Sequence, residues 1–174
     1  MRTAPDSPTS KDKRQEGLYT PEQRARRDRS RWTLVQGILA PVQFLIFAVS
    51  LVLIVRYLIT GQGLEAANWS VVAKTFALYA IMYTGALWEH DVYGQYLFAP
   101  AFYWEDMVSM AVIALHTLYL VSLVFGLFTA NERLFVALAA YTTYAVNATQ
   151  FVLKLRAARL QETRKSASLT GVVA

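Results

Sequence analysis

Three long stretches of this chain carry no Asp, Glu, Lys or Arg, and they constrain the fold more than any other feature. They are residues 32–55, 107–131 and 134–153, which are 24, 25 and 20 residues long. Each can cross a bilayer, whose hydrocarbon core needs about 20 helical residues. Apolar residues surround the helix axis in these stretches, whereas a soluble bundle needs helices with a polar face. The sequence therefore predicts an all-α, polytopic membrane protein.

A fourth, weaker stretch runs from about Trp69 to Trp88. It contains Lys74 near its start, where a long side chain can reach the membrane interface with its ammonium group. With this stretch included, the prediction is a four-transmembrane-helix bundle over residues 32–157. Its spans are expected at about 33–57, 69–89, 105–128 and 133–156.

The distribution of basic residues predicts the orientation of the bundle. Residues 1–31 hold nine Lys and Arg, and residues 154–174 hold five of the total of 17. Because cytoplasmic flanks are enriched in Lys and Arg, we expect both termini to be cytoplasmic. An even number of spans agrees with this, and it places the connection between the second and third spans, residues 90–104, on the same side.

The two ends of the chain are expected to differ from the bundle. Residues 1–17 have the composition of a disordered tail, and residues 158–174 form a basic C-terminal tail. Residues 18–31 are expected to form a basic interfacial helix that starts at a capping box of Thr20 and Gln23, with Pro21 at the first helical position. Its arginines suit anionic lipid headgroups, and no nucleic-acid-reading module accompanies them.

Several classes of chemistry lack support in the sequence. The chain has no cysteine, which excludes disulfides, thiolate zinc sites, iron–sulfur clusters and thiol nucleophiles. No glycine-rich turn of the dinucleotide or P-loop kind follows a strand. The most hydrophobic stretches lie far from the amino terminus, so no cleavable signal peptide is expected.

Polar side chains gather in the half of the bundle that is predicted to be cytoplasmic. On the third span, Glu105, Ser109 and His116 follow a spacing that places them on one helix face. These side chains also have possible roles outside catalysis. The acids at the ends of the spans can cap a helix or be solvated, and the buried groups can form an interhelical hydrogen bond. The candidate catalytic residues are Glu89, Glu105, Asp106 and His116, and the polar candidates for substrate binding are Gln36, Gln43, Ser109, Asn147 and Gln150.

The connection between the second and third spans has no charge from residue 92 to residue 104 and is rich in aromatic residues. An aromatic belt at the membrane interface is one interpretation. The other is a segment that offers ring faces to a flat apolar ligand, between the carboxylates of Glu89 and Glu105. The candidates for such contacts are Tyr93, Tyr96, Phe98, Phe102 and Trp104.

Three segments make the sequence recognisable: residues 32–44 (WTLVQGILAPVQF), 94–106 (GQYLFAPAFYWED) and 114–117 (ALHT). They resemble the 2-vinyl bacteriochlorophyllide hydratase family of bacteriochlorophyll biosynthesis, and the resemblance covers about residues 18–156. It implies the addition of water to the C3 vinyl group of chlorophyllide a, or of a related 3-vinyl tetrapyrrole, to give a 1-hydroxyethyl group. It also implies a multi-pass protein of the bacterial inner, intracytoplasmic photosynthetic membrane, as a homo-oligomer or in a complex with other bacteriochlorophyll enzymes.

The residues are consistent with this chemistry. Protonation of the terminal vinyl carbon leaves a positive charge that the macrocycle delocalises, and water then attacks. We expect Glu105 as general acid and Glu89 as base, or the reverse, because crowded carboxyl groups retain a proton. Water is the only co-substrate and no cofactor is required. No metal site is expected in the protein itself, although His116 is a candidate axial contact to the magnesium that the substrate carries, and Lys154 or an arginine is a candidate partner for its propionate.

Two other functions fit part of the pattern. A non-catalytic tetrapyrrole carrier or assembly protein needs only the aromatic surface and the basic tails. A haem or quinone membrane anchor is the other, but a bis-histidine haem needs two facing imidazoles. His90 is expected at the surface and His116 about 15 Å deep by helical rise. The role of His90 stays open.

Overall fold

The structure, a computed structural model, describes residues 18–171. The described chain is all-helical: α1 spans Pro21–Arg29, α2 Arg31–Thr60, α3 Leu64–Tyr93, α4 Tyr103–Phe125 and α5 Ala130–Gly171. The fold class is therefore all-α as predicted. The disordered tail expected over residues 1–17 lies outside the described residues.

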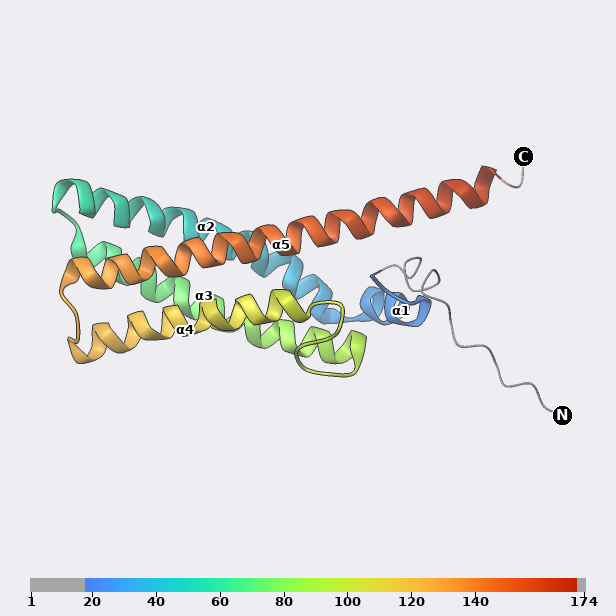
Figure 1. The fold of residues 1–174 in the computed structure, drawn as a ribbon, viewed down its shortest axis with the longest axis horizontal. Coiled ribbons are helices and arrows are strands. Elements are labelled where there is room, and N and C mark those ends of the chain that lie inside the picture. Colours follow the sequence, from blue (N-terminus) through green and yellow to red (C-terminus); the bar gives the residue numbers. More distant parts are fainter. Residues whose placement is uncertain (1–17, 172–174) are drawn as a thin grey trace.

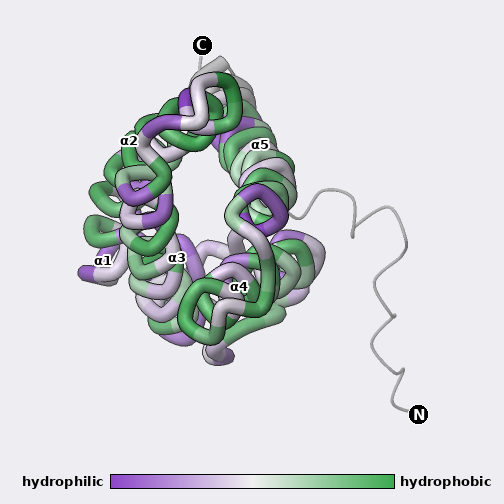
Figure 2. The backbone as a smooth tube through the Cα atoms, turned by 90° about the vertical axis from the view of Figure 1, so that its left-hand side faces the viewer, coloured by the Kyte–Doolittle hydropathy of each residue, from purple (hydrophilic) through white to green (hydrophobic). Residues whose placement is uncertain are grey.

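The four long helices run up and down alongside one another (Figure 1). Neighbouring helices pack in the cyclic order α2, α3, α4, α5, with α5 returning to α2 (Figure 2). One end of the bundle carries α1, the loop between α3 and α4, and the extension of α5, and we call it the α1 end. The opposite end carries the two short turns at 61–63 and 126–129, and we call it the hairpin end.

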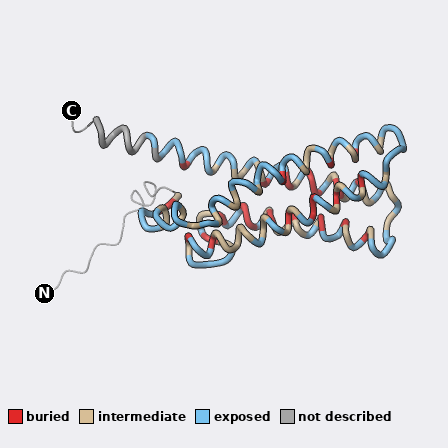
Figure 3. The backbone as a smooth tube through the Cα atoms, turned by 180° about the vertical axis from the view of Figure 1, so that it is seen from behind, coloured by how far each residue is buried: buried red, intermediate tan, exposed pale blue. Residues whose placement is uncertain are grey.

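Three of these helices, α2, α3 and α4, are long and apolar enough to cross a membrane. Their outward faces are hydrophobic, with large exposed side chains such as Leu45, Val52 and Phe76, as expected where lipid rather than water is the solvent. The buried residues are spread along the four long helices and alternate with exposed ones on each helix (Figure 3). The protein is thus a helical membrane protein.

The helices begin and end where local chemistry requires. Thr20 caps α1, since its hydroxyl accepts the Gln23 N–H at 3.2 Å and the Gln23 side chain accepts the Thr20 N–H at 2.9 Å. This is the predicted capping box. Ser30 then separates α1 from α2 with an extended backbone. Its hydroxyl donates to Asp91 at 2.7 Å, which fixes α1 beside the end of α3.

All four long helices begin a few residues before their predicted spans, and α2, α3 and α5 also end beyond them. The helix α3 continues to Tyr93, so Tyr93 belongs to the helix rather than to the connection. The helix α5 continues past residue 156 to Gly171, so the basic C-terminal segment is helical up to that residue (Figure 1).

Hydroxyl groups join the helices in the half of the bundle near the hairpin end. The Ser50 hydroxyl lies 2.6 Å from the Tyr141 hydroxyl and 2.7 Å from that of Ser70, which links α2, α5 and α3. The Tyr119 hydroxyl donates to Asn68 at 2.7 Å and links α4 to α3. In an apolar solvent, such bonds and close packing are the main source of helix association.

Candidate active site

Two carboxyl groups meet at the α1 end of the bundle. Glu89 lies in the last turn but one of α3, and Asp106 lies in the first turn of α4. Their carboxyl groups lie close enough to form a hydrogen bond when one of them carries a proton, and both residues are buried, with 5% and 2% of their surface exposed. A hydrogen bond between two carboxyl groups needs a proton on one of them. The pair can therefore both donate and accept a proton.

The loop between α3 and α4 binds this carboxyl pair through its backbone. The Phe98 N–H donates to Asp106 Oδ2 at 2.8 Å, and the Ala99 N–H donates to Glu89 Oε2 at 3.2 Å. Phe98 adopts a positive φ of 60°, which costs free energy in any residue with a side chain. Phe98 adopts this conformation in the turn of the loop where its own N–H group and that of Ala99 bind the two carboxyl groups.

Glu105 has a different partner from the one the sequence indicates. Its carboxylate accepts a hydrogen bond from Lys154 of α5, with Nζ and Oε2 2.6 Å apart. Lys154 also donates to the carbonyl of Ala101 in the loop. Glu105 thus ties α4 and the loop to α5, and it is Asp106, its neighbour, that contacts Glu89. Lys154 is therefore engaged within the protein.

Aromatic rings surround the carboxyl pair on the side of the loop. Phe102 is buried and packs edge-on against Trp88 at 5.6 Å and Tyr93 at 5.9 Å, and face-on against Phe151 at 5.7 Å. Other rings remain exposed, among them Trp104 with 71% and Tyr96 with 57% of its surface. Exposed rings thus lie in the loop and in the first turn of α4, an arrangement that suits both an aromatic belt at the membrane interface and a ligand-facing segment.

The two histidines lie in different surroundings. His90 is exposed at the end of α3, and its ring stacks on Tyr96 at 4.3 Å between centroids. His116 is fully buried in the bundle and stacks on Tyr141 at 5.7 Å. Its Nδ1 lies 2.8 Å from the Val112 carbonyl oxygen, and its Nε2 has no hydrogen-bond partner. The two imidazoles do not face one position, so they do not form a bis-histidine haem site.

The polar candidates inside the bundle divide into engaged and unengaged groups. Gln36 donates to Thr84 at 2.7 Å and to the Ile81 carbonyl at 3.2 Å, so it joins α2 to α3. Asn147 donates to Ser109 at 2.7 Å and joins α5 to α4. The side-chain oxygens of Gln43, Asn147 and Gln150 are buried without a hydrogen-bond partner.

Lys74 is the residue that sequence reasoning missed. The predicted reach of its side chain to the interface is wrong, because Lys74 is fully buried inside the bundle. Its ammonium lies 3.6 Å from the ring centroid of Tyr144 on α5. The signal in the sequence was the lysine itself within an otherwise apolar span, since an ionisable residue at membrane depth marks a functional site by default.

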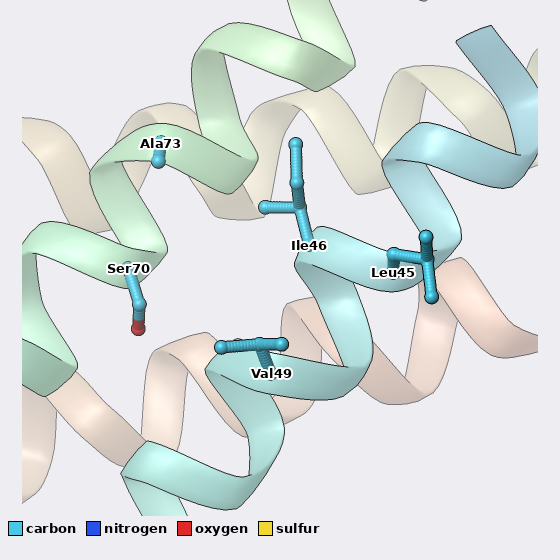
Figure 4. A pocket seen from close by; sticks show the side chains of 5 residues that line it. All are labelled: Leu45, Ile46, Val49, Ser70 and Ala73. Atoms are coloured by element: carbon cyan, nitrogen blue, oxygen red, sulfur yellow. The ribbon is translucent and has the colours of Figure 1, made fainter. Parts of the chain in front are cut away.

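A shallow apolar hollow lies on the outward face between α2 and α3, lined by Leu45, Ile46, Val49, Ser70 and Ala73 (Figure 4). It is about 24 Å along α3 from Glu89 by helical rise. Among the described residues, no group of three or more His, Asp and Glu side chains is placed to hold a metal ion.

Comparison with known proteins identifies the chain. Residues 19–157 match the 2-vinyl bacteriochlorophyllide hydratase family. The chain belongs to this family. A 2-vinyl bacteriochlorophyllide hydratase of Rhodobacter capsulatus is 59% identical over 170 residues, which cover 96% of this chain and 94% of that protein. One of Cereibacter sphaeroides is 60% identical over 159 residues, or 90% of this chain and 95% of that protein. No solved structure matches the chain.

Family membership confirms the resemblance found in the sequence. The chain is a hydro-lyase of bacteriochlorophyll biosynthesis that hydrates a vinyl group. The match includes the carboxyl pair, the loop and His116. It disfavours the haem or quinone anchor and the non-catalytic carrier as descriptions of this chain.

Proposed function

We propose that the chain adds water to the C3 vinyl group of chlorophyllide a, or of a related 3-vinyl tetrapyrrole, with the Glu89–Asp106 pair as the acid and base. The observation that carries this proposal is the close approach of the two buried carboxyl groups. It joins a proton donor and a proton acceptor at one place, next to exposed aromatic rings.

The protonated carboxyl group transfers its proton to the terminal vinyl carbon. The π electrons form the new C–H bond, and the positive charge on the carbon attached to the macrocycle is delocalised into the ring. The oxygen of a water molecule then attacks that carbon. The other carboxylate of the pair, which did not donate the first proton, takes a proton from this water. The pair ends with one proton, as it began, and the net change is the addition of H₂O. No redox cofactor takes part.

The assignment of the donor moves from Glu105 to the pair that contains Asp106. Glu105 is held by Lys154 at 2.6 Å, whereas Asp106 is in contact with the second carboxyl group. We assign Glu105 and Lys154 the role of positioning the loop. Lys154 donates to Glu105 in the first turn of α4 and to the Ala101 carbonyl in the loop. Phe98 and Ala99 hold the pair through their N–H groups.

The remaining residues of the candidate site have binding roles in this proposal. His116 supplies an imidazole nitrogen without a partner, which suits an axial contact to the magnesium of the substrate. The macrocycle stacks on the exposed rings of the loop, and the unpartnered amide oxygens of Gln43, Asn147 and Gln150 contact its polar substituents.

The membrane arrangement that we propose has four spans, with α5 as the fourth, because residues 134–153 carry no charge and α5 packs along α4. Both termini then lie at the α1 end, with their basic residues on the cytoplasmic side of a bacterial inner membrane. The substrate enters from this side.

The proposal is tested by expressing the chain alone in a bacterium that makes no bacteriochlorophyll and adding chlorophyllide a to its membranes. We expect a product heavier by one water, and in ¹⁸O-labelled water the label appears in the hydroxyethyl group. Pigment that binds to the membranes and stays unchanged would favour a carrier, and a Soret band in the protein purified without added pigment would favour a haem anchor.

A further inference from the structure

A second polar group of side chains lies deeper in the bundle than the carboxyl pair. Lys74 on α3 and His116 on α4 are both fully buried, and Lys74 Nζ and His116 Nε2 have no hydrogen-bond partner among the described residues. Gln43 on α2, with 3% of its surface exposed, adds an amide oxygen that is also unpartnered. Three of the four long helices thus contribute to one interior group.

The surroundings of Lys74 contain aromatic rings but no anion. Its Nζ lies 3.6 Å from the ring centroid of Tyr144, and its charge interacts with the imidazole of His116. The acidic residues of the described helices lie at the ends of the bundle or beyond it: Glu65 and Glu132 at the hairpin end, and Glu22, Asp28, Glu89, Asp91, Glu105, Asp106 and Glu162 at the α1 end or on the extension of α5. Glu105 is paired with Lys154. Among the described residues, Lys74 therefore has no carboxylate partner.

An ammonium group in this position is costly. A buried charge without a counter-ion costs several kcal/mol even after the structure relaxes, and the face of an aromatic ring returns only about 2 kcal/mol of that. A methionine or leucine would fill the same volume without this cost. The free energy is recovered when a ligand brings a negative charge to the ammonium.

We propose that Lys74 binds the propionate carboxylate of the tetrapyrrole substrate and thereby sets the direction in which the pigment enters the bundle. This inference rests on the proposed function, and it names the part of the substrate that Lys74 recognises. It also gives the propionate a partner inside the protein, a role that Lys154 cannot fill while it is bonded to Glu105 and Ala101.

The depths of the groups agree with this direction. Along α3, Lys74 lies about 22 Å from Glu89 by helical rise, and along α4, His116 lies about 15 Å from Asp106. His116 is therefore at an intermediate depth between the carboxyl pair and Lys74. In chlorophyllide a, the C3 vinyl group and the propionate are separate substituents on the rim of the macrocycle, and they point in different directions. A carboxylate at Lys74 thus directs the vinyl group toward Glu89 and Asp106.

The test compares binding of chlorophyllide a with binding of its methyl ester, in which the carboxylate is neutral and the macrocycle unchanged. Binding is measured by pigment fluorescence to the purified full chain in lipid nanodiscs. We expect the wild-type chain to prefer the acid by about tenfold or more, the ratio that one charge-assisted hydrogen bond supplies. Lys74→Met should bind the acid and the ester equally, and Lys74→Arg should retain a preference for the acid.

Arg56→Met serves as the matched control, because Arg56 is an exposed cation on α2 and its removal should leave the preference unchanged. A Lys74→Met variant with the wild-type preference would overturn the proposal. If that variant does not fold, equal binding of acid and ester by the wild-type chain would overturn it. Binding is measured without turnover, so the two proposals can fail separately. A Lys74-dependent preference in a chain that hydrates nothing would support the role of Lys74 and contradict the hydratase mechanism. Hydration without any preference for the acid would support the mechanism and contradict the role of Lys74.

Discussion

The carboxyl groups of Glu89 and Asp106 lie close together between α3 and α4, and two consecutive backbone N–H groups, of Phe98 and Ala99, each bind one of them. Because one proton is shared within this pair, infrared spectroscopy of the protein near neutral pH should show the C=O stretch of a protonated carboxyl group. The band should shift in frequency in both Glu89→Gln and Asp106→Asn, since burial still favours the protonated form of the remaining carboxyl group, which then has an amide rather than a carboxylate beside it.

Asp91→Asn is the control for this measurement, because Asp91 is exposed and accepts a hydrogen bond from Ser30, away from the carboxyl pair. The band should persist in this variant. A spectrum of the wild-type chain without the band, or a band at unchanged frequency in both variants of the pair, would refute the shared proton.

The contact between Lys154 and Glu105 should matter for stability and loop position more than for proton transfer. Lys154→Met leaves the buried Glu105 carboxylate and the Ala101 carbonyl without their donor, which should lower the free energy of unfolding by about 1–3 kcal/mol. The measurement is thermal unfolding in detergent. Lys154→Arg should recover most of the loss, and Glu105→Gln should reduce turnover only a few-fold. Complete loss of turnover in a folded Glu105→Gln protein would return the role of proton donor to Glu105.

The backbone of Phe98 provides a third test. Its φ of 60° suits glycine better than any residue with a side chain, so Phe98→Gly should keep the N–H donor to Asp106 and retain turnover. Phe98→Val should lose turnover, because a β-branched residue resists positive φ. Parallel turnover assays on the two variants are the measurement. Equal activity in both variants would show that the loop conformation does not hold the carboxyl pair.

His116 should distinguish pigments by their metal. His116→Leu should weaken binding of magnesium chlorophyllide about tenfold or more, while binding of the magnesium-free pigment changes little, because only the axial contact is lost. Fluorescence titration of both pigments gives the ratio. His90→Leu, at the exposed histidine, should leave the ratio unchanged. A His116→Leu variant with the wild-type ratio would remove the axial contact from the account.

The sequence predicted much of the fold because charge-free stretches and helix caps are local signals. The uncharged run before Arg56 became α2, and the capping box at Thr20 and Gln23 formed as expected. The end of α5 could not be predicted in this way, because its last turns extend beyond the apolar stretch and depend on helix propensity alone.

The candidate site was predicted in its location but not in its pairing. Residues 89, 105 and 106 were all expected at the same end of the bundle, and they are. Which acid meets Glu89 depends on the rotation of α4, and adjacent residues on a helix point about 100° apart. Lys154, which pairs with Glu105, is about 50 residues away in the sequence. No local sequence pattern could therefore predict this pair. The burial of Lys74 likewise depends on how α3 is rotated toward α5.

Turnover of the carboxyl variants tests the central claim most directly. Wild-type, Glu89→Gln, Asp106→Asn and the double variant are placed in membranes with chlorophyllide a, pigment binding is verified, and the hydroxyethyl product is quantified by mass. Each single variant should bind pigment and lose about 10²- to 10⁴-fold in rate, and the double variant should lose little more, because the two groups act as one unit. Near-wild-type product formation by either single variant would contradict the account.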